Sequence, residues 1–558
     1  MKKILLLTIL ALNIVVIYSC GDKFLDVKPR NELTDATFWK TEQDATLALN
    51  GCYRLWEAYA NIALFDGASD NAYEKSNFGF QVLGNGTLTP ANYNVSGSWI
   101  DWFHFMDENG GGDFSASVNW YPYTRIRKYN NFLANIDRVP MADAKKAQYK
   151  SEIRFLRAYD YFWKVMLHGD VPLVTKVINA TDELPRDPAA KVKQFVLDEL
   201  SAVITEGALP IQNTIDSKGH VTRGAALALR ARLELIMGNY AAAMADAKAV
   251  IDMPCYELFP NYRDLFLEKS EGINKEAILN VQYIVNDYEQ SLTQISLPAG
   301  DGGWSALNAT KSMADAYECS NGKTITDPTS GYDINDPFKN RDPRMEMSML
   351  HPGQLWKGRY YNTLDQFMPD GSPNPDYNRN EPAARSGMNI IKYINSLADS
   401  PGGWPPNFGG DIMVIRLAEM YLIYAEAAVE TNTNAAAALD YINAIRARSG
   451  HIKATTLTRA LVRNERRVEL AFEGLRYLDI MRWDLGPQVL NGPLYGSRRG
   501  TMNFSNGSIT WVGNGNDVND VNYIKLETRT FNPVRKYLFP IPQAEMDANR
   551  KMVQNPGY

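Results

Sequence analysis

The stretch that decides the fold is residues 231–254, which reads ARLELIMGNYAAAMADAKAVIDMP. Apolar residues recur in it at helical spacing on both sides of Gly238-Asn239-Tyr240, a short segment suited to a bend. Ala231 falls near the middle of the first predicted helix, and Ala243 and Val250 fall on the second. Because small residues let two antiparallel helices approach closely, the stretch predicts a helical hairpin.

A second, approximate copy of this pattern runs over residues 417–448, with a polar turn at residues 431–434. Ala425 and Ala427 precede the turn, and Ala438 and Ile445 follow it. Both copies resemble the tetratricopeptide repeat, although each taken alone also fits an accidental Ala-rich hairpin. A regular solenoid would have adjacent repeats, so we expect a mostly α fold in which tetratricopeptide-like helical pairs form a scaffold interrupted by long irregular excursions.

Glycine and proline mark where those excursions fall. They make up 25 of the 113 residues from 298 to 410, against 67 of 558 in the whole chain, and this composition breaks helices and builds turns. We therefore predict one domain over residues 35–558, in which irregular loops carry the ligand face. Its helical blocks lie at about 35–60, 130–280 and 411–485, its loop-rich excursions at about 61–123 and 298–410, and its C-terminal tail at 486–558.

The overall composition is that of a folded protein without affinity for nucleic acid. Hydrophobic residues make up 45% and charged residues 22% of the 558 positions, an ordinary globular balance. The 58 Lys and Arg residues are outnumbered by 64 Asp and Glu residues, giving a formal net charge of -6. A nucleic-acid partner is therefore not expected, because the basic surface that it requires is missing at the level of the whole chain.

The N-terminal segment predicts secretion followed by lipid anchoring. Lys2 and Lys3 precede an apolar run over residues 4–17, which is typical of a signal peptide over residues 1–19 and too short to span a bilayer. Cys20 stands where bacterial lipoproteins carry their lipidated cysteine, and residues 20–34 would form a tether. The remaining cysteines, Cys52, Cys255 and Cys319, are widely spaced and fit buried small hydrophobes better than a disulfide framework.

Several longer motifs resemble those of one family. They are GDKFLDVKPRNELTDATFWKTEQDATLALNGCY at residues 21–53, EIRFLRAYDYFWKVMLHGDVPLVT at 152–175, NRDPR at 340–344, RLAE at 416–419, RRVELAFEGLRYLDIMRW at 466–483 and YLFPIPQAEMDANRKMVQNPGY at 537–558. Together they resemble the SusD/RagB family of Bacteroidetes outer-membrane lipoproteins. The resemblance implies a lipid-anchored protein on the cell surface, seated over a TonB-dependent transporter barrel. It would capture glycans, or in some branches peptides, and pass them to that barrel.

Parts of these motifs have a sufficient structural explanation. Within residues 466–483, apolar side chains lie on one face of a predicted helix, while Glu465, Glu469 and Glu473 recur every four residues among arginines. Neighbouring arginines lower carboxylate pKa values, so these glutamates are not expected to act as acids in catalysis. We assign to the core the aromatic residues that the motifs carry or that precede the second helical block: Trp39, Tyr53, Trp120, Tyr121, Tyr123, Trp163 and Trp483.

The sequence contains no complete motif for catalysis, cofactor binding or metal binding. The five histidines stand apart from one another, and the polar group of Asp517, Asn519 and Asp520 lacks the glycine and terminal Glu of an EF-hand loop. No enzyme activity, cofactor or metal is therefore assigned. A secreted glycosidase stays an alternative, because two carboxylates at a suitable separation are enough for glycoside hydrolysis.

The candidate glycan-binding residues lie in the two excursions. Residues 61–123 contain 13 aromatic side chains in 63 positions, about twice the chain average. Aromatic rings on loops can lie against the C–H face of a sugar while polar neighbours bond its hydroxyls. The candidates are Asp70, Asn71, Tyr73, Trp99 and Trp102 in the early excursion, and Trp304 and Trp404 in the middle one.

These residues favour a non-catalytic protein that binds an oligosaccharide or polysaccharide and delivers it to a SusC-like, TonB-dependent barrel. A tryptophan in a Gly-rich loop can also simply pin that loop to the scaffold. A RagB-like peptide-binding lid and a repeat scaffold without a small ligand stay open as further alternatives.

Overall fold

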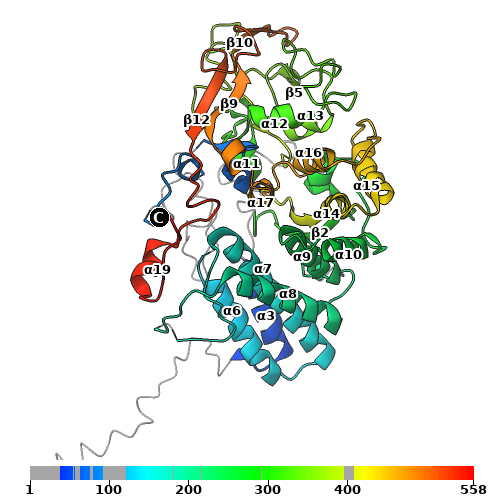
Figure 1. Ribbon diagram of the computed structural model, residues 1–558, viewed down its shortest axis with the longest axis vertical. Helices are drawn as coiled ribbons and strands as arrows, with labels where there is room; N and C mark the ends of the chain where they lie inside the picture. Colours follow the sequence, from blue (N-terminus) through cyan, green and yellow to red (C-terminus); the bar gives the residue numbers. More distant parts are fainter. Residues whose placement is uncertain are drawn as a thin grey trace, which may run out of the picture.

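The structure is a computed structural model that describes residues 38–54, 56, 63–75, 80–91, 121–179, 181–214, 217–290, 292–394 and 408–558. Helices dominate its lower and right-hand parts in the view of Figure 1, and short strands lie at its upper end. Within the described residues, no helix combines the length and the apolar character needed to cross a membrane.

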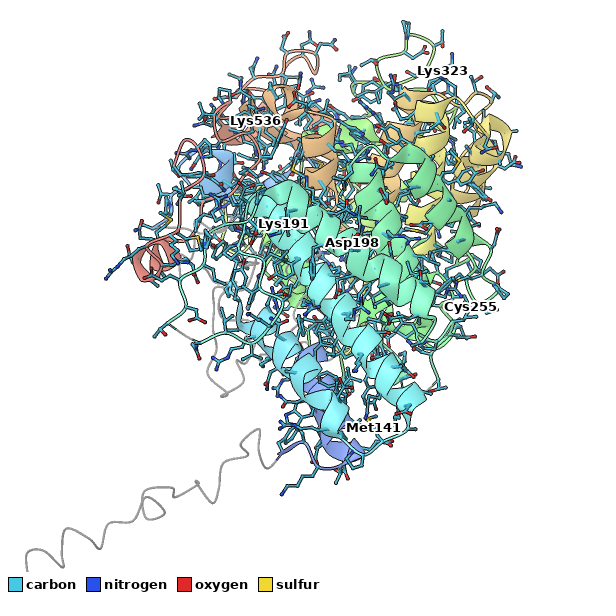
Figure 2. The ribbon with its side chains drawn as sticks, turned by 60° about the horizontal axis from the view of Figure 1, so that its bottom comes forward. Met141, Lys191, Asp198, Cys255, Lys323 and Lys536 are labelled. Atoms are coloured by element: carbon cyan, nitrogen blue, oxygen red, sulfur yellow. The ribbon has the colours of Figure 1, made fainter. Side chains whose placement is uncertain are left out.

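The helical part is an array in which each long helix packs on the next. Its members are α3 (Glu42–Tyr53), α6 (Thr124–Asn135), α7 (Asp143–His168), α8 (Ala189–Glu206), α9 (Arg223–Ile236), α10 (Tyr240–Ile251), α14 (Leu417–Thr431), α15 (Ala435–Arg448) and α16 (Arg459–Glu469). Helix α8 lies on the outside of this array, with Lys191 and Asp198 exposed to solvent (Figure 2).

The two hairpins expected from the sequence are confirmed. Helices α9 and α10 meet at a bend where Gly238 has a φ of 79°, and α14 and α15 meet at a turn in which Asn432 and Asn434 have positive φ values. The hairpins are distant in the sequence, yet α10 packs directly on α14. Ala243 and Ala425 are fully buried, which is the close approach that small side chains permit.

Shorter helices punctuate the excursions and the tail. They are α5 (Gln81–Gly84), α11 (Leu292–Ser296), α12 (Lys311–Ala316), α13 (Arg344–Ser348), α17 (Arg476–Arg482), α18 (Gly486–Val489) and α19 (Gln543–Ala548). The predicted continuous helix over residues 466–483 is wrong. Helix α16 ends at Glu469 and α17 begins at Arg476, because Phe472 and Gly474 adopt φ values of 63° and 74°, which no right-handed helix accommodates.

The strands are short, and their pairings within the described residues are antiparallel. They are β1 (Ala72–Glu74), β2 (Ala277–Val281), β3 (Leu307–Ala309), β4 (Met349–Leu350), β5 (Leu355–Trp356), β6 (Arg359–Tyr360), β7 (Asn389–Ile390), β8 (Ile412–Arg416), β9 (Gly492–Arg498), β10 (Gly500–Met502), β11 (Ile509–Trp511) and β12 (Tyr523–Arg529). The largest sheet has the order β1-β3-β7-β4, and the other strands form pairs.

A buried ion-pair network joins the middle excursion to the helical array. None of its side chains is more than 8% exposed. Arg416, at the end of β8, is bonded to Glu276, Glu469 and Glu473, so it ties β2 to the segment between α16 and α17. The cations of the network are Arg344, Lys392, Arg416, Arg446 and Arg448, and its carboxylates are Glu276, Glu318, Asp342, Glu465, Glu469 and Glu473.

This network explains the row of glutamates seen in the sequence. Burial alone would raise the pKa values of Glu469 and Glu473, but the surrounding guanidinium and ammonium groups hold both values below the usual range. The expectation that neighbouring arginines lower the carboxylate pKa values is therefore confirmed for Glu469 and Glu473. Their role is to fix the scaffold on which the excursions stand.

Candidate functional site

The early and middle excursions meet in one sheet. Strand β1 pairs with β3 in antiparallel register, with Tyr73 opposite Asn308, and the amide of Lys75 donates to the carbonyl of Ala306 at 2.9 Å. Strand β3 begins three residues after Trp304, so the segment 70–73 lies beside the loop that carries this tryptophan. The structure thus brings together the described candidates from the two excursions.

Asp70 and Asn71, however, face the interior. Guanidinium nitrogens of Arg467 and Arg476 lie 2.9 and 2.8 Å from the carboxylate oxygens of Asp70. The Nε of Arg467 also donates to the Oδ1 of Asn71 at 2.9 Å. Burial alone would raise the pKa of Asp70, but the two guanidiniums hold it well below its usual range. The two residues act as internal ties to α16 and α17, and their burial leaves little surface for a ligand.

Tyr73 and Trp304 are also held by the scaffold, to different degrees. Tyr73 is 8% exposed, its hydroxyl accepts a hydrogen bond from Gln81 at 3.0 Å, and burial raises its pKa to about 12. Trp304 is half-buried against the main core. Its loop is closed by Gln294, which donates to the carbonyl of Gly302 at 2.6 Å. Trp304 thus keeps an accessible part, whereas Tyr73 offers little surface to a ligand.

Three candidate ligand residues and the predicted anchor lie outside the described residues. These are Trp99, Trp102, Trp404 and Cys20. Trp120, which was assigned to the core, lies outside them as well.

The aromatic residues assigned to the core divide into two groups. Trp39, Tyr121 and Trp163 are buried, as predicted. Tyr53 and Tyr123 are half-buried and pack against the core, whereas Trp483 is half-buried but is not one of the residues that pack against it. The indole of Trp483 lies between the guanidiniums of Arg463 and Arg482, 4.6 and 4.4 Å from their central carbons.

The remaining cysteines are free thiols. Cys52 and Cys319 are buried as predicted, and burial raises the pKa of the Cys52 thiol to about 12. Cys255 is half-buried, contrary to the expectation, because it lies on a turn after α10 rather than on a packed helical face.

A tryptophan that sequence reasoning missed lies in the middle excursion. Trp356 is on the β5–β6 hairpin, where it pairs with Arg359 across the strands. The turn is Lys357-Gly358, and both residues have positive φ, 48° and 80°, as a tight two-residue hairpin requires. Trp356 is half-buried, with the ammonium of Lys357 5.3 Å from its ring, and Leu355 beside it is 64% exposed.

A network of hydrogen bonds that involves charged side chains holds this indole in place. The Nε1 of Trp356 donates to Asp301 at 2.6 Å, and Arg359 donates to Asp301 at 2.9 Å and to Asp376 at 3.1 Å. Asp376 also accepts from the amide of Gly300 at 2.8 Å. We call Asp301, Trp356, Arg359 and Asp376 the Trp356 cluster.

The two carboxylates of the Trp356 cluster are buried, and its guanidinium is partly open. The Asp301 and Asp376 side chains are 8% and 5% exposed, whereas that of Arg359 is 35% exposed. Burial raises the pKa of Asp376, although the Gly300 amide and Arg359 oppose the rise. Two carboxylates share one guanidinium, so the cluster is polar and joined by hydrogen bonds, with an aromatic ring at its edge.

This arrangement is suited to binding and not to proton transfer. A fixed indole supplies apolar area, and the partly open guanidinium and the Lys357 ammonium supply donors for hydroxyl groups. Both carboxylates are already bonded to Arg359, which leaves no isolated acid beside a base. Among the described residues, no group of three His, Cys, Asp or Glu side chains is placed to hold a metal ion.

The sequence signal that could have predicted the Trp356 cluster is LWKGRYY at residues 355–361, a hairpin with aromatic and basic residues around a Lys-Gly turn.

Comparison with known proteins places this chain in a family. Residues 275–558 match the family model described as the SusD family, and residues 23–235 match one described as starch-binding associating with outer membrane. The chain belongs to the SusD family, as its motifs indicated, and the predicted mostly α, tetratricopeptide-like fold is that of the family.

Individual relatives are similar over most of their length. The SusD-like protein P38 of Formosa agariphila is 25% identical over 535 residues, covering 89% of this chain and 94% of that protein. The starch-binding protein SusD of Bacteroides thetaiotaomicron is 25% identical over 493 residues, covering 79% and 80%. A SusD-like carbohydrate binding protein from Bacteroides fragilis has a similar structure, with a TM-score of 0.78 and 27% identity over 92% of this chain and 99% of that one. These relatives support a carbohydrate-binding class of function.

Proposed function

We propose that this protein is a non-catalytic lipoprotein of the cell surface that captures oligosaccharides and delivers them to a TonB-dependent transporter of the outer membrane. The observation that carries the proposal is the Trp356 cluster, a half-buried indole held by Asp301 on an irregular excursion of a SusD-family scaffold. Ring stacking on the sugar and hydrogen bonds from Arg359 and Lys357 would hold the ligand. Trp99, Trp102, Trp304 and Trp404 are proposed as further contacts on the same excursions.

A weak complex suits this role, because cargo must be released. Dissociation constants between about 1 μM and 1 mM correspond to only about -8 to -4 kcal/mol. A ring contact adds roughly 0.5–1.5 kcal/mol beyond the area that it buries, so its loss should be measurable against so weak a background.

Calorimetry and affinity electrophoresis against a panel of soluble glycans test the proposal. The Trp356→Ala variant is expected to bind the preferred glycan at least about fivefold more weakly, in keeping with the loss of one ring contact. Tyr441→Ala is the matched control, because Tyr441 is also half-buried but lies on α15 in the helical array. Tight binding of peptides without binding of any glycan, or release of sugar from the panel, would contradict the proposal.

The delivery and anchoring steps need separate measurements. Replacement of Cys20 by Ser should move the protein from the membrane fraction to the soluble one. Affinity purification of the lipidated protein from its own membranes should recover a transporter barrel. Recovery of no barrel would contradict the delivery step and leave the glycan measurements unaffected.

A further inference from the structure

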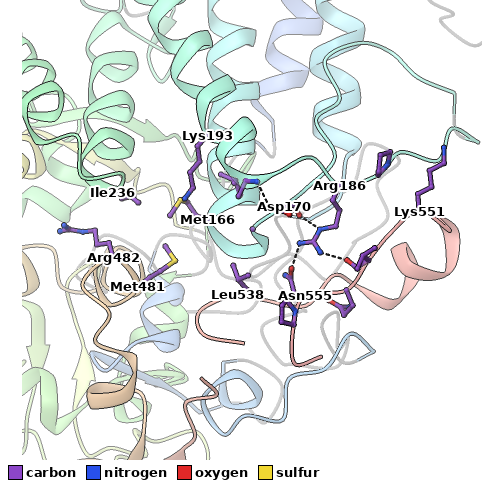
Figure 3. Close-up of a pocket in the computed structure, with 17 residues that line it drawn as sticks. Met166, Asp170, Arg186, Lys193, Ile236, Met481, Arg482, Leu538, Lys551 and Asn555 are labelled. Atoms are coloured by element: carbon purple, nitrogen blue, oxygen red, sulfur yellow. Dashed lines mark hydrogen bonds between the residues drawn. The ribbon is translucent and has the colours of Figure 1, made fainter. Parts of the chain in front are cut away.

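A large cavity lies away from the Trp356 cluster, where the ends of several helices meet the C-terminal tail. Its volume is about 780 Å³, within the range of small-molecule sites. It is lined by the end of α7, the start of α8, the end of α9, the end of α17 and residues 551–556 (Figure 3). No candidate residue from the sequence lines it.

One part of the cavity lining is apolar. Val165 and Met166 from α7, Ile236 from α9, Met481 from α17 and Leu538 from the tail supply it. Met166, Met481 and Lys193 all line this cavity (Figure 3). Unbranched methionine side chains adapt to apolar bodies of different shapes.

The charges on the lining are predominantly positive. The lining cations are Arg186, Lys193, Arg482 and Lys551, and Asp170 is the carboxylate among the described lining residues. Arg482 is neutralised outside the cavity by Glu426 and Asp479. Lys551 donates to the carbonyl of Glu183. The excess of cations contrasts with the net charge of -6 on the whole chain.

Three of these cations, Arg186, Lys193 and Lys551, have no carboxylate bonded to them in the described structure. The guanidinium of Arg186 donates to the carbonyls of His168, Asp170 and Val553 and to the side-chain oxygen of Asn555, all neutral acceptors. The ammonium of Lys193 makes no hydrogen bond and no ion pair with any described residue, and its side chain is half-buried. Burial lowers the pKa of Lys193.

A half-buried ammonium beside an apolar wall has lost part of its hydration, and an anion that pairs with it would offset this loss. The carboxylate of Asp170 forms no ion pair with Lys193 and instead accepts a hydrogen bond from the first amide of α8 at 2.7 Å. We propose that this cavity binds a small organic anion, with its anionic head group at Lys193 and its apolar body against Met166 and Met481. This site is independent of the proposed glycan function.

Three probes that share one apolar body test the head group. Calorimetry with 4-phenylbutyrate, 4-phenylbutanol and 4-phenylbutylamine should give binding of the carboxylate at least about tenfold tighter than that of the alcohol, and no binding of the amine. Decanoate serves as a second carboxylate with a longer body. Equal affinity for the three phenyl probes, or no binding of either carboxylate, would overturn the proposal.

Variants of α8 locate the site. Lys193→Met keeps the apolar stem and removes the charge, and should weaken phenylbutyrate binding at least about tenfold, whereas Lys193→Arg should change it less than about threefold. Lys191→Met is the control, because Lys191 is on the same helix but is 63% exposed and paired with Asp187 at 2.7 Å. Unchanged binding by folded Lys193→Met, or equal losses in the Lys191 and Lys193 variants, would place the anion elsewhere and refute the assignment.

Discussion

Replacing Arg416 by Met should destabilise the protein strongly, because this side chain sits at the centre of the buried ion-pair network. Its guanidinium is 1% exposed and makes five hydrogen bonds. They go to the carboxylates of Glu276, Glu469 and Glu473 and to the carbonyl of Glu469, at 2.7–2.8 Å. Methionine fills a similar volume but leaves these acceptors without their donor.

The size of the stability loss depends on the ion pairs that remain after the substitution. Glu473 keeps Lys392 at 2.6 Å, and Glu469 keeps Arg344 at 3.0 Å and its contact with Arg448. Glu276 also keeps its contact with Arg448, so each of the three carboxylates retains a cation. The cost should therefore be that of breaking one buried pair, roughly 3–5 kcal/mol, and not the sum of five charged hydrogen bonds. The stability of Arg416→Lys should lie between those of the wild type and Arg416→Met, because an ammonium keeps the charge but not the planar fork of donors.

Urea unfolding followed by circular dichroism measures this loss. Arg459→Met is the matched control, because Arg459 is 57% exposed and paired with Glu430 on the surface, a contact worth roughly 0–1 kcal/mol. Added salt should shrink the Arg459 effect and leave the Arg416 effect nearly unchanged, since buried pairs are screened less. A loss for Arg416→Met no larger than that for Arg459→Met would refute the reasoning.

Two further predictions concern groups outside the network. Burial, followed by the charge of Asp411, raises the pKa of Glu271 from 4.5 to about 7, so its stabilising contribution is present below pH 4.5 and lost as the pH rises through 7. Glu271→Gln should therefore raise the melting temperature more at pH 8 than at pH 5 in scanning calorimetry, and equal shifts would contradict this. Gly303→Ala should cost roughly 1–3 kcal/mol by urea unfolding, because its Cβ would lie 2.1 Å from the carbonyl oxygen of Leu297. Gly272→Ala, where no atom lies within 4 Å, should change stability by less than about 0.5 kcal/mol, and a loss matching that of Gly303→Ala would show that the contact is not the cause.

The helical pairs could be predicted from the sequence because their causes are local. Periodic apolar residues, buried alanines and the bend at Gly238 lie within two dozen residues of one another. The break between α16 and α17 could not, because the apolar periodicity continues through Phe472 while the backbone does not. Arg416 and Glu473 are 57 residues apart and Arg344 and Glu465 are 121 apart, so no local pattern announces that they pair.

The candidate site was harder to predict, for a related reason. A polar residue on an irregular segment looks the same in the sequence whether it faces solvent or an internal guanidinium. Asp70 was expected to meet a ligand, but its partners Arg467 and Arg476 lie some 400 residues further along the chain. Trp356 lies outside the Gly-rich loops, and its exposure depends on a tight hairpin with a Lys-Gly turn.

The residues that carried the family resemblance are mainly the ones that hold the scaffold. Asp342 and Arg344 in the NRDPR motif, Arg416 in RLAE, and Glu469 and Glu473 in the long arginine-rich motif all belong to the buried network. Because these side chains are buried, the motifs show how the excursions are held in place, and they do not identify a ligand. Ligand choice must then depend on side chains that the network leaves exposed, so exchanging the 355–360 hairpin between family members should change glycan preference without changing stability by more than about 1 kcal/mol. A chimera that loses stability by several kcal/mol, or keeps the original preference, would show that the hairpin belongs to the scaffold.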